Sequence, residues 1–177
     1  SNNNVYHAVD NGINVGYSDN VVLNNNMVAN VMDNWFYKDS YLNYHNFDMD
    51  GLYMPAGIAA WEEITLTSFK NNAISGIQGP AFEYIGEPCD ISEVDGGASG
   101  ASISSGNYAH SSLYGVRLLY TEADKTCSKF SGFNVARIQS NAFITFNEAD
   151  NTIVDNFDIQ DRVHNKDNSE RVQWNNL

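Results

Sequence analysis

The spacing of asparagines near the two ends of the chain is the sequence feature that most limits its fold. Two triplets repeat the same gaps of 17 and then 5 residues: Asn3, Asn20 and Asn25, and Asn134, Asn151 and Asn156. Apolar side chains alternate with polar ones between these asparagines. A return after 22 residues with alternating apolar positions is typical of a chain that winds through successive similar turns, each turn being one rung of a parallel β-helix.

A second pattern recurs in the middle of the sequence. A small residue follows eight positions after a leading asparagine in four places: Asn4 and Gly12, Asn71 and Gly79, Asn107 and Gly115, and Asn134 and Ala142. Asn26 and Asn34 form a looser copy. The five leading asparagines are separated by 22, 45, 36 and 27 residues. We therefore expect rungs of about 22 residues, two rungs between Asn26 and Asn71, and insertions in the longer intervals.

The residue types suit such rungs. Val, Ile, Phe and Tyr at alternate positions favour short strands, and stacking places each side chain over its equivalent in the next rung. Asn and Gly tolerate the left-handed backbone that sharp corners need, and stacked asparagines form amide ladders. The 25 asparagines could also reflect a biased composition and a polar surface, but bias alone does not explain the repeated gaps.

The sequence thus predicts an all-β fold, a right-handed parallel β-helix that forms a single segment over residues 1–177. Two loop insertions are expected, near residues 86–106 and 120–129, because these stretches lack the periodic pattern. The irregular stretch from Asn34 to Met54 predicts one poorly conforming rung with a bulged loop. Both ends of the sequence fall inside predicted rungs, so we expect the chain to be a piece of a longer protein.

The charge of the chain limits its partners. Nine Lys and Arg stand against 22 Asp and Glu, giving a formal net charge of -13. Nucleic acids require clustered basic residues, and the same repulsion disfavours strongly anionic polysaccharides and membrane surfaces. The sequence has no apolar run of membrane-spanning length, so no membrane insertion is expected within it. Neutral glycans and protein partners remain compatible with this charge.

Two stretches resemble a known family. The segments GNYAHSSLYGVRLL (Gly106 to Leu119) and CSKFSGFNVARIQSNAF (Cys127 to Phe143) resemble the parallel β-helix repeat regions of fibrocystin and fibrocystin-L, which are related to the transmembrane protein 2 group associated with hyaluronan. The similarity extends from about Asn3 to Asp161 and is weak from Asn34 to Ala60.

The resemblance implies an extracellular segment of a long cell-surface or ciliary protein, with protein or glycan partners at the cell surface. It implies a non-enzymatic structural or adhesive module that acts as a rigid spacer and interaction surface, and no catalytic motif carries over. Two other functions stay open from the residues: a carbohydrate-active β-helix that binds or cleaves a polysaccharide as a lyase or hydrolase, and a filament subunit that self-associates by stacking its end rungs.

The two cysteines predict a disulfide. Cys89 and Cys127 each lie in one of the two insertions, on what should be adjacent rungs. A bond between them would tie the loops together and suits an oxidising compartment. The alternative is two separate thiols.

An acidic stretch suggests a calcium site. Asn46, Asp48 and Asp50, followed by Gly51, copy the first half of a calcium-binding loop. The acid expected at the twelfth position of such a loop is missing, since Gly57 stands there. A run of solvated turn residues is therefore the favoured interpretation, with calcium as the alternative cofactor.

A column of basic residues is the candidate glycan-binding site. His110 and Arg137 each lie three residues after a leading asparagine, so we expect them to stack, with Arg117 and Lys129 nearby. Polysaccharide-processing β-helices carry their functional residues on such outward columns. The alternative is a surface arginine and a histidine that packs in a turn. No carboxylate pair shares a column, and Glu83 and Glu148 are the nearest candidates.

Exposed aromatic residues would provide stacking surfaces for sugars. The candidates lie in the irregular stretch: Trp35, Tyr37, Tyr41 and Tyr44. Packing inside the β-helix is the more common role of such side chains.

Overall fold

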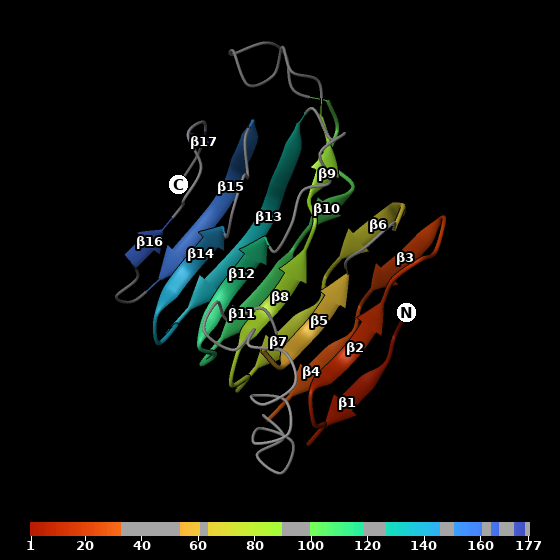
Figure 1. Ribbon diagram of the computed structural model, residues 1–177, viewed down its shortest axis with the longest axis vertical. Helices are drawn as coiled ribbons and strands as arrows, with labels where there is room; N and C mark the ends of the chain where they lie inside the picture. The colour runs from red at the N-terminus through yellow and green to blue at the C-terminus, as the bar shows by residue number, and fades with distance from the viewer. Residues whose placement is uncertain are drawn as a thin grey trace, which may run out of the picture.

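The computed structural model shows an all-β protein (Figure 1). It describes residues 1–32, 54–60, 64–89, 100–118, 127–145, 151–160, 164–166 and 172–175. Within these ranges no helix forms, and every strand pair is parallel except that of β9 with β13. The prediction of an all-β chain with parallel strands is confirmed at this level. Among the described residues there is also no helix of the length and apolarity that crossing a membrane requires.

The strands form three sheets. The first sheet contains, in spatial order, β1 (Asn4–Tyr6), β4 (Met27–Ala29), β7 (Ala73–Ser75), β11 (Asn107–His110), β13 (Ser128–Ala136), β15 (Thr152–Gln160) and β17 (Val172–Asn175), with β9 (Glu87–Pro88) antiparallel to β13. The second sheet contains β2 (Asn11–Val15), β5 (Ala56–Ala60), β8 (Pro80–Tyr84), β12 (Tyr114–Leu118), β14 (Asn141–Thr145) and β16 (His164–Lys166). The third contains β3 (Val21–Asn24), β6 (Leu66–Lys70) and β10 (Ser104–Ser105).

The chain visits the sheets in a recurring order. Strands β1, β2 and β3 belong to the first, second and third sheets in turn, and β4, β5 and β6 repeat this order. In Figure 1 the second sheet runs from β2, in orange-red, to β14, in blue. This order and the parallel pairing are consistent with a β-solenoid.

A ladder of asparagines, three of which are buried, joins the first four strands of the first sheet. Each amide oxygen accepts hydrogen bonds from the side-chain Nδ2 and the backbone N–H of the asparagine in the preceding strand. The Nδ2 to Oδ1 distances are 3.0 Å from Asn3 to Asn26, 2.8 Å from Asn26 to Asn72 and 2.9 Å from Asn72 to Asn107. Asn107 ends the ladder, because its Nδ2 donates to Phe69 O and Ser104 Oγ. The predicted stacking of asparagines is therefore present.

Some of the leading asparagines predicted from the spacing differ by one residue from those that form the ladder. Asn26 and Asn107 belong to the ladder as predicted, but their partners are Asn3 and Asn72 in place of Asn4 and Asn71. The chain has asparagines at both neighbouring positions, so spacing alone cannot separate them. At the next strand Phe133, and not Asn134, aligns with Asn107. A one-residue slip matters because it moves a side chain from the interior to the exterior.

The asparagines spaced five residues apart are corner residues. Asn20 and Asn25 flank β3, and Asn151 and Asn156 flank the first half of β15; all four have positive φ, between 50° and 56°. Asparagine is among the few residues that adopt this backbone readily. The repeated five-residue gap thus marks a four-residue stretch of strand between two left-handed corners.

The prediction of two rungs between Asn26 and Asn71 is wrong. Strand β4 pairs directly with β7, and the laddered Asn26 and Asn72 are 46 positions apart in the sequence. One passage through the sheets therefore spans this interval. The expected extra rung falls on residues 33–53, which lie outside the described residues, as does Asn34.

Small residues form a second interior column where the first two sheets approach each other. Its members, aligned by strand pairing, are Gly12, Gly57, Ala81, Gly115 and Ala142. A Cβ atom on Gly57 would lie 2.4 Å from Ile74 Cγ2 and 2.5 Å from Ala81 O, so a larger residue does not fit there. The predicted set of small residues had Gly79 in place of Ala81, an error of two positions along the strand.

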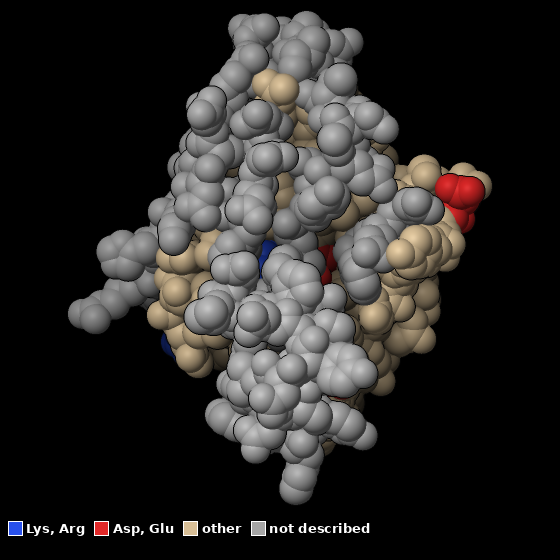
Figure 2. All heavy atoms as spheres, viewed as in Figure 1, with Lys and Arg blue, Asp and Glu red and all other residues tan. Residues whose placement is uncertain are grey.

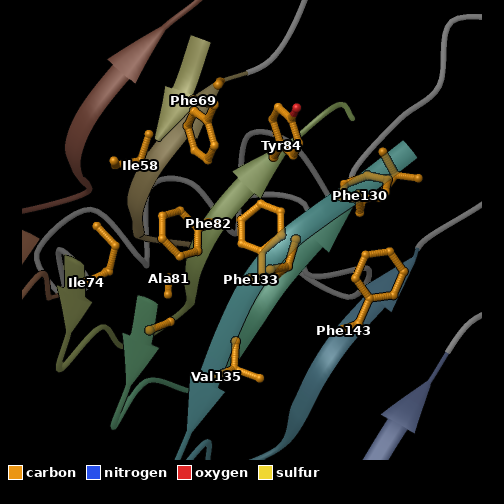
Figure 3. Close-up of a cluster of buried hydrophobic side chains, with 14 of the residues drawn as sticks. Ile58, Phe69, Ile74, Ala81, Phe82, Tyr84, Phe130, Phe133, Val135 and Phe143 are labelled. Atoms are coloured by element: carbon orange, nitrogen blue, oxygen red, sulfur yellow. The ribbon is translucent and has the colours of Figure 1, made fainter. Parts of the chain in front are cut away.

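Aromatic rings fill the interior beyond the asparagine ladder (Figure 3). Phe82 lies 5.7 Å from Phe69 and 5.3 Å from Phe133 between ring centroids, both in edge-on contacts. Tyr84 stacks on Phe69 at 4.9 Å. These rings come from all three sheets, and their burial from water stabilises the packing of the sheets against one another.

Candidate functional site

The outer face of the first sheet carries a group of exposed aromatic side chains. Along each short strand, buried and outward-facing residues alternate, as expected for period two. Val28, Ile74 and Ala109 are buried at the centres of β4, β7 and β11. Their neighbours therefore face outward. We call the outward side chains of β1, β4, β7 and β11 the aromatic face: Asn4, Tyr6, Met27, Ala29, Ala73, Ser75, Tyr108 and His110.

Two pairs of large side chains stand on this face. Tyr6 is 53% exposed and Met27 38%, and the Tyr6 hydroxyl lies 3.5 Å from the Met27 sulfur. Tyr108 is 40% exposed, and its ring centroid is 5.5 Å from that of His110. His110 Nδ1 lies 3.1 Å from Ser111 Oγ, so the other ring nitrogen takes no part in this contact. Each ring is thus held by a neighbour while keeping an exposed surface.

Only small residues lie between the two pairs. Ala29 pairs with Ser75, and Ala73 aligns with both Met27 and Tyr108. With about 4.8 Å between neighbouring strands, Met27 and Tyr108 are about 10 Å apart, and Tyr6 and His110, which share a level three strands apart, about 14 Å. The face therefore presents rings on either side of a low central strip.

The aromatic face carries no fixed charge, although the chain has a net charge of -13. Its side chains are hydroxyl, amide, imidazole, thioether and methyl groups. Continuing across the sheet, Asn134 follows Tyr108, and the first acid is Asp158, whose carboxylate accepts a hydrogen bond from Gln160 at 2.8 Å. Figure 2 shows one face of the molecule in the orientation of Figure 1, where only small areas of the described acidic and basic side chains are visible.

The four basic residues of the predicted column do not come together. His110 pairs with Ala136, while Arg137 lies one position later at a left-handed corner, over Ser111. Arg117 is in the second sheet and fully buried. Lys129 is buried near the start of β13. The expectation that His110 and Arg137 share one column is therefore wrong, again by one residue, because the leading Asn134 is not equivalent to Asn107.

Arg117 instead forms a buried ion pair with Glu83. The two side chains lie on adjacent strands, β12 and β8, and Arg117 Nη2 contacts Glu83 Oε2. Burial raises the pKa of the Glu83 carboxyl above its usual value, and the nearby Arg117 charge only partly offsets this effect. The alignment of Glu83 with Arg117 across the sheet shows that the pair is part of the packing of the second sheet.

Lys129 and Glu87 form a second cluster of buried charged side chains. The Glu87 carboxylate accepts hydrogen bonds from the backbone N–H groups of Ile103 and Ser104, at 2.9 and 3.0 Å, and from the Ser102 hydroxyl. Lys129 pairs with Glu87 across the antiparallel strands, and its Nζ donates to Gly100 O at 3.0 Å. Both charged groups therefore hold residues 100–104 against β9 and β13. Neither is arranged to meet a ligand.

The predicted disulfide is present beside this group. Cys89 and Cys127 are bonded, with their Cα atoms 5.1 Å apart and 38 positions between them in the sequence. The bond joins the ends of β9 and β13, which also pair as strands.

The predicted calcium ligands Asn46, Asp48 and Asp50 lie outside the described residues, as do Glu148 and the aromatic candidates Trp35, Tyr37, Tyr41 and Tyr44. In the part of the chain that the structure describes, no three His, Cys, Asp or Glu side chains are grouped to hold a metal ion.

The aromatic face was not identified from the sequence. Tyr6 and Tyr108 lie in segments whose alternation was recognised, but alternation does not say which of its two sets faces inward. The signal that could have found them is the asparagine ladder: once Asn3 and Asn107 are placed inside, Tyr6 and Tyr108 must lie outside.

Comparison of the chain with models of protein families, with curated proteins and with solved structures finds no match.

Proposed function

We propose that this chain is a right-handed parallel β-helix module with rungs of about 22 residues and loop insertions, serving as a rigid spacer and interaction surface in a fibrocystin-like extracellular protein at the cell surface or cilium. In this proposal it is not an enzyme. Its partners bind the outer face of the first sheet.

The buried asparagine ladder is the observation that carries this proposal. It links four successive strands through side-chain and backbone hydrogen bonds. Asn26, Asn72 and Asn107 are all buried. Breaking a step between two buried members, Asn26 and Asn72 or Asn72 and Asn107, would leave a buried amide group without its partner, at a cost of about 1–3 kcal/mol. Such a ladder holds the strands in one register, which is what a stiff spacer needs.

The disposition of charged side chains also favours a spacer. Glu83, Arg117, Glu87 and Lys129 are all buried and engaged with other parts of the chain. They support the packing of the strands, and the exposed rings are left for contact with a partner.

A carbohydrate-active enzyme is the second candidate. The observation in its favour is the raised pKa of Glu83 beside a cation, since perturbed carboxyl groups gather at catalytic sites. Against it, Arg117 is 0% exposed and Glu83 6% exposed, so a polysaccharide cannot reach them in this conformation.

The test is a depolymerisation assay on the purified chain, with and without calcium, against neutral and acidic polysaccharides. New reducing ends and the absorbance of unsaturated sugars are measured. We expect no product from any substrate. Product formation that disappears in Glu83→Gln, while the variant keeps its β-rich circular dichroism, would reject the spacer in favour of the enzyme.

A further inference from the structure

We propose that the aromatic face of the first sheet binds a neutral oligosaccharide. The proposal rests on the proposed function, since it names the ligand class for the surface assigned there to partners. It is carried by the exposed rings, by their spacing and by the lack of fixed charge among the side chains of the aromatic face itself.

The rings offer the apolar surface that a sugar requires. One face of a pyranose ring presents C–H groups, and the electron-rich face of an aromatic ring attracts them. Tyr6 and Tyr108 are 53% and 40% exposed, which leaves much of each ring open to such contact. Tyr6 lies against Met27, and Tyr108 lies against His110. These contacts limit the movement of the rings, so binding orders fewer side chains.

The spacing of the rings suits a chain of sugars more than a single one. Tyr6 and His110 share a level of the sheet about 14 Å apart, since three strand spacings separate them. Ala29 and Ser75 lie between them and are too small to obstruct a ligand that bridges both. A short oligosaccharide lying across the strands can therefore contact both ring pairs at once.

Polar groups that can contact sugar hydroxyls lie in the centre and at the edges of the same surface. Ser75 occupies the low strip, and the amides of Asn4 and Asn134 flank the two ring pairs on the outward column that contains Met27, Ala73 and Tyr108. Asn4 and Asn134 are both exposed. Amide and hydroxyl groups both donate and accept hydrogen bonds, as sugar hydroxyls do.

The charge of the molecule selects a neutral sugar over an acidic one. A uronate or sulfated chain would meet the repulsion of a protein with a net charge of -13 and would find no fixed cation on the aromatic face. A neutral glycan is not repelled by this charge and needs no cation to bind. A basic protein partner would need acidic groups here, and the aromatic face has none.

The experiment is isothermal titration of the 177-residue chain with three probes: cellohexaose, mannohexaose and an acidic oligogalacturonate of the same length. We expect at least one neutral hexasaccharide to bind and the acidic one not to bind. Tyr108→Ala should weaken binding about tenfold or more through loss of stacking. Tyr108→Phe keeps the ring and should bind nearly as the unmodified chain does.

Tyr17→Ala is the matched control, because Tyr17 is 70% exposed and follows β2, away from the first sheet. It should leave binding unchanged. Three outcomes would overturn the proposal: no neutral probe binds, the acidic probe binds as well as the neutral ones, or Tyr17→Ala weakens binding as much as Tyr108→Ala. Sedimentation that shows dimers of the unmodified chain but monomers of Tyr108→Ala would assign the face to a second copy of the chain and would also overturn it.

These outcomes are separable from a failure of the proposed function. If no sugar binds and the depolymerisation assay yields no product, the ligand class is wrong and the spacer stands. If product appears, the spacer is wrong whether or not the aromatic face binds sugar.

Discussion

The interior of the first sheet changes character part-way along the molecule. In its first four strands one interior column consists of amides, Asn3, Asn26, Asn72 and Asn107, while the next two strands place Phe133 and Phe157 in that same column. An amide ladder gains specificity, because a strand shifted by one residue loses its bonds. A phenylalanine stack gains burial, worth about 1.5–3 kcal/mol for each side chain, but has no hydrogen bonds between its successive side chains.

The largest expected effect on stability comes from a substitution in the part of this column that consists of phenylalanines, which we call the aromatic half. Phe133 is fully buried against Phe69, Phe82 and Phe157. Phe133→Ala should lower the free energy of unfolding by about 3–5 kcal/mol because it leaves a cavity. Urea denaturation measures this loss, and Tyr108→Ala on the exposed side of the adjacent strand is the control. A loss below that of the control would show that the aromatic half is loosely packed. Phe133→Asn sharpens the comparison, because it tests whether the ladder can extend by one strand.

The disulfide lies beside the phenylalanine strands, since Cys89 follows β9 and Cys127 precedes β13, the strand that carries Phe133. Replacing both cysteines by serine should cost about 3–4 kcal/mol, because the bond restrains a long loop in the unfolded chain. Thermal unfolding of the variant, compared with the unreduced chain, measures the cost. Equal melting temperatures would mean that strand pairing of β9 with β13 already supplies the restraint.

A substitution in the asparagine ladder, the amide half of the column, should lower the free energy of unfolding by less. Asn72→Ala removes the acceptor used by Asn26 and the donor used by Asn107, and the expected loss is about 2–3 kcal/mol. Asn3→Ala, at the exposed end of the ladder, should cost under about 1 kcal/mol. Urea denaturation of both variants makes the comparison. If the two cost the same, the ladder does not act through buried unsatisfied groups.

The smallest expected effect is a pH dependence of stability, which arises from Glu83 in the second sheet and so lies outside both halves of the column. The pKa of Glu83 is raised in the folded protein, so folding favours its protonated form. Its contribution to stability is therefore fully present below the unfolded-state pKa, near the ordinary value of 4.5, and is lost as pH rises through the raised value. The difference in unfolding free energy between the unmodified chain and Glu83→Gln should fall over that window. A difference that grows with pH would mean that Arg117 dominates and lowers the pKa.

The sequence could predict the strand type and the corner positions. Positive φ at Asn20, Asn25, Asn151 and Asn156 follows from a residue preference that local spacing reveals. The pairing of Cys89 with Cys127 followed from the placement of each in an insertion. These features depend on a few neighbouring residues or on a single pairing choice.

Register could not be predicted, and the site depends on register. Asn3 and Asn4, or Asn71 and Asn72, cannot be told apart by spacing, because each pair consists of two adjacent asparagines. Only one member of each pair joins the ladder. The same one-residue ambiguity separated His110 from Arg137 and hid Tyr108. What decides it is the packing of whole sheets, in which an inward Asn4 would force Val5 outward.

The ladder also determines where the chain can vary. Asn26 and Asn72 bond at 2.8 Å although 46 positions separate them, and Asn72 and Asn107 bond at 2.9 Å across 35. The length of chain between two laddered asparagines can therefore differ while the hydrogen bonds stay the same, because each strand is positioned by its neighbours in space. The same property predicts that a foreign peptide inserted between two laddered asparagines would leave the hydrogen bonds of the ladder in place, so that one scaffold could carry different peptides.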